Sequence, residues 1–135
     1  MMDLSMAIIK SDLIMAKQGI DLFKNKGIKE IKNQTAYHLQ QAIEKLIKIQ
    51  VYSSGVAYNN RSMYVHNISS LTAYADGLNI NVDIPTEVRN NAINISDWEA
   101  SGRYDLHFSV RIDTLEKYYK VATDWYNRLY KNGIR

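Results

Sequence analysis

The feature that most constrains the fold is the spacing of apolar residues, which recur every three or four positions along most of the chain. This spacing lines one face of an α-helix with apolar side chains. A half-buried strand needs strict alternation instead, and alternation over the length of a strand is hard to find. The pattern therefore predicts an all-α protein.

Residue types that start or stop helices divide the pattern into five stretches. Gly27 follows the first stretch, and Pro85 suits the first turn of the fourth. Ser101-Gly102 is a stop signal for the fourth stretch. Asp113 and Glu116 have the spacing of a capping box at the start of the last. The predicted helices cover residues 4–24, 28–53, 61–75, 85–100 and 113–130, and residues 103–112 are expected to form an ordered loop.

Length and composition indicate one domain over residues 1–135. No repeat, low-complexity tract or linker interrupts the chain, and 135 residues is an ordinary domain size. Apolar residues make up 46% of the chain and charged residues 23%, which is typical of a globular protein. With short connections between helices, the expected architecture is an up-and-down bundle of four or five helices.

Several classes of site are excluded by residue types that the sequence lacks. There is no cysteine, so disulfides, thiolate metal sites and cysteine nucleophiles are excluded. No pair of histidines has metal-ligand spacing with a carboxylate, and no glycine-rich phosphate loop is present, so neither a metal nor a cofactor is expected.

The amino terminus lacks the basic start of a signal peptide, and no stretch approaches the roughly 20 apolar residues of a membrane span. We therefore expect a cytoplasmic protein with no membrane contact.

Positive charge is concentrated in one part of a chain whose net charge is only +3. Residues 17–48 contain seven lysines and only three acidic residues, Asp21, Glu30 and Glu44, so their net charge is +4. The rest of the chain has a net charge of about −1. A basic patch could attract phosphate-rich partners, but a solvated lysine-rich helix face is the simpler interpretation. The seven are Lys17, Lys24, Lys26, Lys29, Lys32, Lys45 and Lys48.

The three histidines, His38, His66 and His107, are the first candidates for chemistry, since imidazole exchanges a proton near neutral pH. A lone histidine more often has a structural or surface role. His66 is distinguished by Arg61, which stands five residues before it at the expected start of the third helix.

At a helix start, unpaired backbone amides and the helix dipole favour an anion. Arginine can bind a phosphate through two parallel hydrogen bonds, and histidine can carry a proton. Arg61 and His66 are thus candidate catalytic residues for phosphodiester chemistry. The neighbouring Asn60, Ser62 and Asn67 are candidate substrate-binding residues.

Three segments together resemble the HEPN domain family. The segment AYHLQQAIEKLIK, residues 36–48, is similar to its second helix, with a Gln-Ala-x-Glu-Lys core and a further lysine. VHNISSL, residues 65–71, resembles its His-Asp-Leu helix start, with Asn67 in place of the usual aspartate. GRYD, residues 102–105, resembles its Arg-Tyr element before the last helix. The segments lie in the family's order and span most of the chain.

The resemblance implies a helical bundle that forms a homodimer. Many members are ribonucleases or toxins with an arginine, four to six residues, then a histidine, which Arg61 and His66 match, although Ser62 replaces the usual Asn, Asp or His. The resemblance then implies metal-independent RNA cleavage at the dimer cleft, with Arg61 on the phosphate and His66 exchanging protons. Other members bind nucleotides or partner a nucleotidyltransferase that acts as antitoxin. The alternatives are therefore a non-catalytic nucleotide-binding or interaction module, and a structural dimer.

Overall fold

Every regular element in the described part of the protein is an α-helix, which confirms the all-α prediction. The computed structural model describes residues 4–104 and 110–135. Its helices are α1 (Met6–Lys26), α2 (Lys29–Ser53), α3 (Asn60–Met63), α4 (Ile68–Gly77), α5 (Thr86–Asn90), α6 (Ala92–Tyr104) and α7 (Ile112–Lys131).

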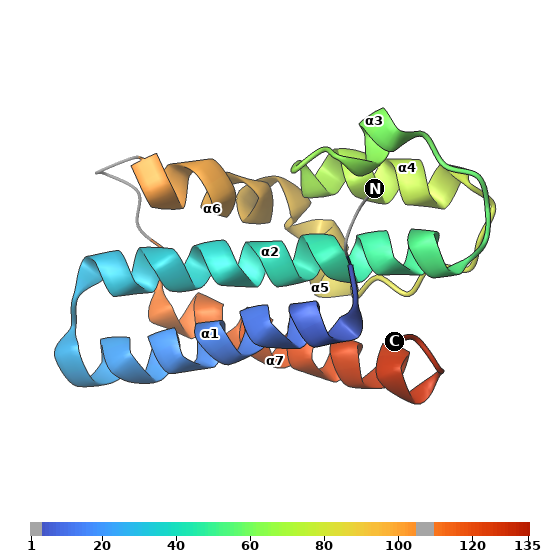
Figure 1. Ribbon diagram of the computed structural model, residues 1–135. Helices are drawn as coiled ribbons and strands as arrows, with labels where there is room; N and C mark the ends of the chain where they lie inside the picture. Colours follow the sequence, from blue (N-terminus) through green and yellow to red (C-terminus); the bar gives the residue numbers. More distant parts are fainter. Residues whose placement is uncertain (1–3, 105–109) are drawn as a thin grey trace.

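The long helix α2 lies at the centre of the bundle (Figure 1). Helices α1 and α7 pack against one side of it, and α4 and α6 pack against the other. The short helix α3 lies at the outer edge, beyond α4. A bundle is therefore confirmed, but its second layer is built from shorter helices than the predicted up-and-down arrangement contains.

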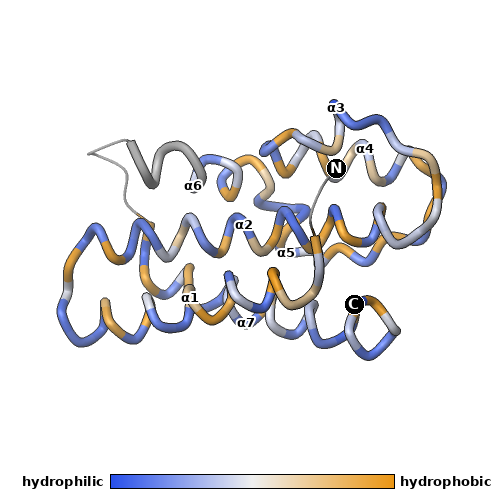
Figure 2. Tube along the Cα trace, in the orientation of Figure 1, coloured by the Kyte–Doolittle hydropathy of each residue, from blue (hydrophilic) through white to orange (hydrophobic). Residues whose placement is uncertain are grey.

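The core follows from the position of α2 between two layers. Hydrophobic and hydrophilic residues alternate along the long helices at helical spacing (Figure 2). On α2 the apolar side chains of Leu39, Ala42, Ile43, Leu46 and Ile47 are all fully buried. A helix that contacts neighbours on two sides must be apolar over more of its surface than a helix with one buried face. No helix in residues 4–104 or 110–135 is long and apolar enough to cross a membrane.

The two longest helices were predicted within two residues of their bounds because local signals define their ends. Ser5 caps α1 by accepting a hydrogen bond from the amide of Ile8. Gly27 ends α1 with a φ of 68°, a left-handed conformation that glycine adopts without strain. Gly55, with a φ of 77°, follows the end of α2 in the same way.

The predicted third helix is wrong, because the structure divides it into α3 and α4 with a connection at residues 64–67. Two asparagines explain the division. The side chain of Asn59 accepts hydrogen bonds from the amides of Arg61 and Ser62, which starts α3. The side chain of Asn67 accepts one from Ser70, which starts α4. Each asparagine offers the backbone a cap in place of a continuing helix.

The predicted fourth helix is also divided, into α5 and α6 at Asn91. The Asn91 side chain bonds back to the carbonyl of Glu87, and its φ of −123° is not helical. Helix α6 then continues past the expected stop at Ser101-Gly102 to Tyr104. The loop predicted over residues 103–112 is wrong at 103–104 and 112, which are helical, and its residues 105–109, with His107, lie outside the described residues.

The capping box predicted at Asp113 is not formed. Helix α7 begins at Ile112 with Arg111 as its N-cap, so Asp113 lies inside the first turn. Glu116 does not reach back to the helix start but pairs with Lys24 on α1 at 2.7 Å. Glu116 thus pairs with a residue that is distant in sequence and not with the backbone at the start of its own helix.

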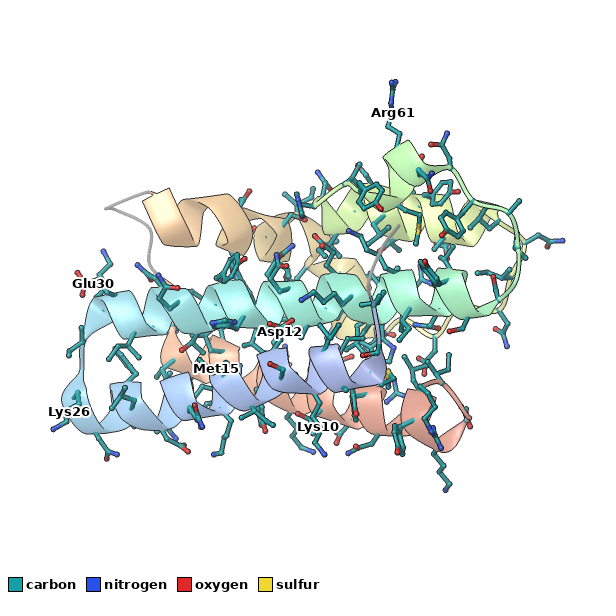
Figure 3. The ribbon with its side chains drawn as sticks, viewed as in Figure 1. Lys10, Asp12, Met15, Lys26, Glu30 and Arg61 are labelled. Carbon is teal, nitrogen blue, oxygen red and sulfur yellow. The ribbon has the colours of Figure 1, made fainter. Side chains whose placement is uncertain are left out.

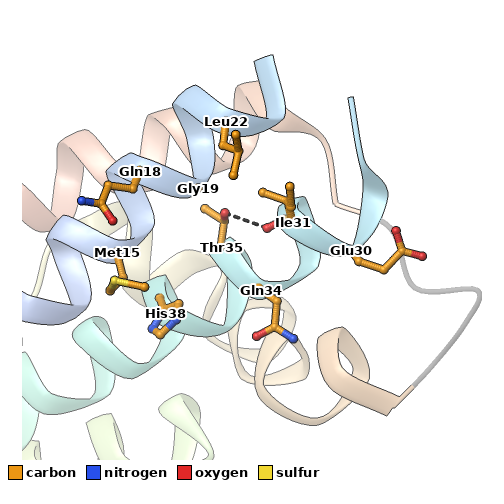
Figure 4. Close-up of a pocket in the computed structure, with 9 residues that line it drawn as sticks. All are labelled: Met15, Gln18, Gly19, Leu22, Glu30, Ile31, Gln34, Thr35 and His38. Atoms are coloured by element: carbon orange, nitrogen blue, oxygen red, sulfur yellow. Dashed lines mark hydrogen bonds between the residues drawn. The ribbon is translucent and has the colours of Figure 1, made fainter. Parts of the chain in front are cut away.

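Helices α1 and α2 approach closely at Gly19. A Cβ at this position would lie 1.9 Å from Oγ1 of Thr35, which is buried and donates a hydrogen bond to the carbonyl of Ile31 (Figure 4). An open cavity of about 300 Å³ lies beside the crossing, with Met15 and His38 among its lining residues. Only a residue without a side chain fits this crossing.

We expect Gly19→Ala to lower the free energy of unfolding by about 1–3 kcal/mol, because the added methyl forces Thr35 or the helices to move. Gly77→Ala is the matched control, since a Cβ at Gly77 would meet nothing within 4 Å. It should be neutral or slightly stabilising. Urea denaturation of the two variants measures the difference, and equal midpoints would show that the crossing has room for a methyl group.

Candidate functional site

Arg61 lies on α3, where its side chain is exposed and extends away from the bundle (Figure 3). Its guanidinium forms no ion pair or hydrogen bond with any residue of the described ranges. Asn60 and Ser62 flank it on the same short helix. Arg61 is therefore a free cation at the edge of the molecule.

His66 lies in the connection between α3 and α4, and α2 holds it at two points. Its ring Nδ1 is 2.9 Å from Oε1 of Glu44, and the side-chain amide of Gln40 donates to the His66 carbonyl at 3.2 Å. The His66 side chain is 60% exposed, whereas that of Glu44 is only 3% exposed. An exposed imidazole is thus fixed to a buried carboxylate.

A lysine on the same helix compensates the buried carboxylate. Nζ of Lys48 is 3.0 Å from Oε2 of Glu44, and the Lys48 side chain is only 6% exposed. The amide of Gln40 contacts Oε1 of Glu44 at 3.3 Å. Both carboxylate oxygens therefore have partners, as a buried charge requires. Gln40, Glu44, Lys48 and His66 are called the Glu44 cluster below.

The geometry of the Glu44 cluster suits proton transfer. When Nδ1 of His66 carries the proton and donates a hydrogen bond to Glu44, Nε2 keeps its lone pair and can accept a proton from a substrate hydroxyl. The carboxylate then stabilises the imidazolium that forms. The buried Glu44 also fixes the orientation of the ring.

Sequence reasoning singled out His66 but missed Glu44, Gln40 and Lys48 as its partners. Their signal was present, because these three polar residues recur every four positions along an otherwise apolar helix face. From the sequence, residues 36–48 indicate a helix and the family resemblance, and Lys48 is assigned to a solvated helix face. That assignment is wrong for Lys48, which is buried.

Arg61 and His66 do not share one helix start, so the expected cradle of free backbone amides is wrong. The amides of Arg61 and Ser62 donate to Oδ1 of Asn59, at 2.8 and 3.3 Å. The side chain of Asn67, a candidate substrate-binding residue, caps α4 by accepting a hydrogen bond from the amide of Ser70 at 3.0 Å. These internal caps occupy the groups that an anion would use.

Three of the other six lysines of the basic segment form ion pairs within the protein itself. Lys17 contacts Asp21 at 3.1 Å, and Lys45 contacts Asp12 at 2.7 Å. Lys24 pairs with Glu116, as described above. These pairs neutralise part of the local positive charge, which favours the simpler interpretation of this segment over a phosphate-binding patch.

Asp12 links α1 to α2 through Lys45 and through Nδ1 of His38, which lies 3.5 Å away. Burial raises the pKa of Asp12, but the contacts with His38 and Lys45 outweigh it and leave this pKa below its usual value. A carboxyl whose pKa is lower in the folded state stabilises the fold above its unfolded pKa of about 3.9. That contribution is lost as the pH falls below this value.

We therefore expect Asp12→Asn to weaken the dependence of the unfolding free energy on pH below about pH 4, because the variant has no carboxylate there to protonate. Asp21→Asn, which removes a carboxylate from the exposed pair on the same helix, is the matched control. Urea denaturation between neutral and acidic pH measures both slopes. A wild-type slope in Asp12→Asn would contradict the assignment.

Among the described residues, no group of three or more histidine, aspartate or glutamate side chains is placed to hold a metal ion. Comparison with protein-family models, with curated proteins and with solved structures finds no match to this chain.

Proposed function

We propose that this chain is a metal-independent endoribonuclease of the HEPN type, with His66 as its proton-transfer residue. The observation that carries the proposal is the exposed imidazole of His66 bonded to the buried carboxylate of Glu44. The resemblance of residues 36–48 and 65–71 to the HEPN family supports it, since the two segments supply the two partners of this contact.

The reaction needs only groups that RNA and the protein provide. The ribose 2′-hydroxyl attacks the adjacent phosphorus while Nε2 of His66 accepts its proton. The bond from phosphorus to the 5′-oxygen breaks, that oxygen takes up a proton from water as it leaves, and His66 returns the proton that it accepted to water. The products are a 2′,3′-cyclic phosphate and a 5′-hydroxyl.

Arg61 is the proposed phosphate-binding residue, contributed by a second copy of the chain. Its side chain extends away from the bundle and has no partner in the described part of its own chain. In a homodimer, Arg61 of one copy would neutralise the phosphate at His66 of the other. Asn60 and Ser62 would then contact the substrate beside Arg61. The toxin role and a nucleotidyltransferase antitoxin rest on the family resemblance.

Incubation of the purified protein with single-stranded RNA in excess chelator tests the reaction class. We expect fragments that end in 2′,3′-cyclic phosphate, and no cleavage of DNA of the same sequence, which lacks the attacking hydroxyl. Intact RNA, or cleavage that stops when metal is removed, contradicts the proposal.

The alternative of a non-catalytic nucleotide-binding or partner-binding module predicts a different result. Such a module would leave the RNA intact, and a nucleotide or a nucleotidyltransferase would raise its melting temperature, since a ligand of the native state must stabilise it.

A further inference from the structure

A cavity between the start of α6 and helix α7 has a composition unlike a simple packing defect. Its volume is about 350 Å³, within the range of small-molecule sites. Besides two aliphatic residues, its lining contains aromatic, amide, hydroxyl and cationic side chains, namely Asn91, Asn94, Trp98, Thr114, Lys117 and Tyr118.

Two aromatic rings form a rigid wall of this cavity. The rings of Trp98 and Tyr118 meet edge to face, with centroids 5.6 Å apart, and both side chains are almost fully buried. The Tyr118 hydroxyl donates to the carbonyl of Glu87 at 3.2 Å. Burial raises the pKa of Tyr118, so the phenol stays neutral. A fixed aromatic wall suits a planar ligand.

The other lining residues offer polar recognition. The Asn91 side chain is held by its bond to Glu87, whereas the Asn94 side chain is exposed and forms no hydrogen bond with another described residue. A side-chain amide presents a donor and an acceptor side by side, which matches the edge of a nucleobase, and of adenine in particular. Lys117 is exposed, with Nζ 5.6 Å from the centre of the Tyr118 ring, where it can bind a phosphate.

Polar residues connect this cavity with the loop that carries His66. A second cavity of about 320 Å³ shares Asn91 and Asn94 with the first and is also lined by Ser69, in the first turn of α4. The amide of Ile68, two residues after His66, donates to Oγ of Ser96 on α6 at 2.7 Å. The two cavities therefore adjoin at Asn91 and Asn94, between Ser69 at the start of α4 and Trp98 on α6.

From this arrangement we infer that the cavity between α6 and α7 binds a nucleobase with its phosphate, as a subsite for a nucleotide near the cleaved bond. The inference rests on the proposed ribonuclease function for its assignment to RNA. Trp98 and Tyr118 contact the base, Asn94 bonds to its edge, and Lys117 pairs with its phosphate.

Titration with adenosine 5′-monophosphate tests the subsite without any cleavage. The Trp125→Phe variant has Trp98 as its single tryptophan. The substitution removes no hydrogen bond, because Nε1 of the buried Trp125 has no hydrogen-bond partner among the described residues. We expect the nucleotide to change Trp98 fluorescence, and Asn94→Ala to weaken binding at least about five-fold, the loss of one hydrogen bond. Asn81→Ala, on an exposed asparagine elsewhere, should bind normally. Calorimetry on the wild-type chain gives the same comparison if Trp125→Phe does not fold.

Three results would overturn the subsite: no binding, the same response to inorganic phosphate alone, or equal affinity in Asn94→Ala. The Michaelis constant for RNA cleavage distinguishes an RNA subsite from a site for free nucleotide. If the cavity is an RNA subsite, Asn94→Ala raises this constant; if it binds free nucleotide only, the constant does not change. Nucleotide binding that depends on Asn94, with RNA left intact, would retain the pocket and refute the nuclease. RNA cleavage without nucleotide binding would support the nuclease and refute the nucleotide subsite.

Discussion

Glu44→Ala is expected to lower the free energy of unfolding by about 3–5 kcal/mol, because it leaves the ammonium of Lys48 buried without a counter-charge. The Lys48 side chain is only 6% exposed, so water cannot replace the lost carboxylate without rearrangement of the helix layer. Gln40 and His66 lose an acceptor in the same step. Urea denaturation at neutral pH measures the loss.

The double variant Glu44→Leu, Lys48→Met is the control for this prediction. It removes both charges and fills their space with apolar atoms, which is often neutral for a buried ion pair. We expect its free energy of unfolding to lie within about 1 kcal/mol of the wild-type value. If it is as unstable as Glu44→Ala, the loss comes from packing or from the bond to His66 and not from the unpaired lysine.

His66→Ala is expected to reduce the rate of RNA cleavage by about 10²–10⁴-fold, which is the usual contribution of a general acid or base. The fold should persist, since the ring is largely exposed and lies outside the helices. Single-turnover cleavage in chelator measures the rate, and thermal unfolding verifies the fold.

Free imidazole distinguishes chemistry from structure in this variant. Added imidazole can occupy the space beside Glu44 and accept the substrate proton, so it should restore part of the rate to His66→Ala. His38→Ala removes a histidine from the opposite, α1-facing side of α2, and the variant should keep its rate once its stability is matched. Full activity in His66→Ala, or a loss of the same size in His38→Ala, would remove His66 from the mechanism.

The elements that the sequence predicted well are those whose signals are local. Helices α1 and α2 are long and periodic, and Gly27 ends the first with a conformation that only the local backbone determines. Asn67 shows the limit of this reasoning. An asparagine within an apolar periodic stretch is compatible with a continuing helix, and the new helix start depends on the amide of Ile68 bonding to Ser96 on α6.

The candidate site was predicted in part for the same reason. The sequence shows that residue 66 is a histidine and that it stands five residues after Arg61, and these two facts were enough to predict His66 as a candidate. The role of Glu44 depends on which side of α2 is covered by the connection at residues 64–67, and that is a property of tertiary packing. The prediction of one continuous helix over residues 61–75 also concealed that Arg61 and His66 belong to different elements.

The proposed role of buried Glu44, which is to hold exposed His66 for proton transfer, is tested most directly by the single-turnover RNA cleavage rate of the Glu44→Leu, Lys48→Met variant in chelator. This variant keeps His66 and Arg61 but removes the carboxylate that orients the ring. We expect active wild-type protein and a folded variant that is slower by at least about ten-fold. A folded variant with the wild-type rate, or a wild-type protein that leaves RNA intact, would contradict it.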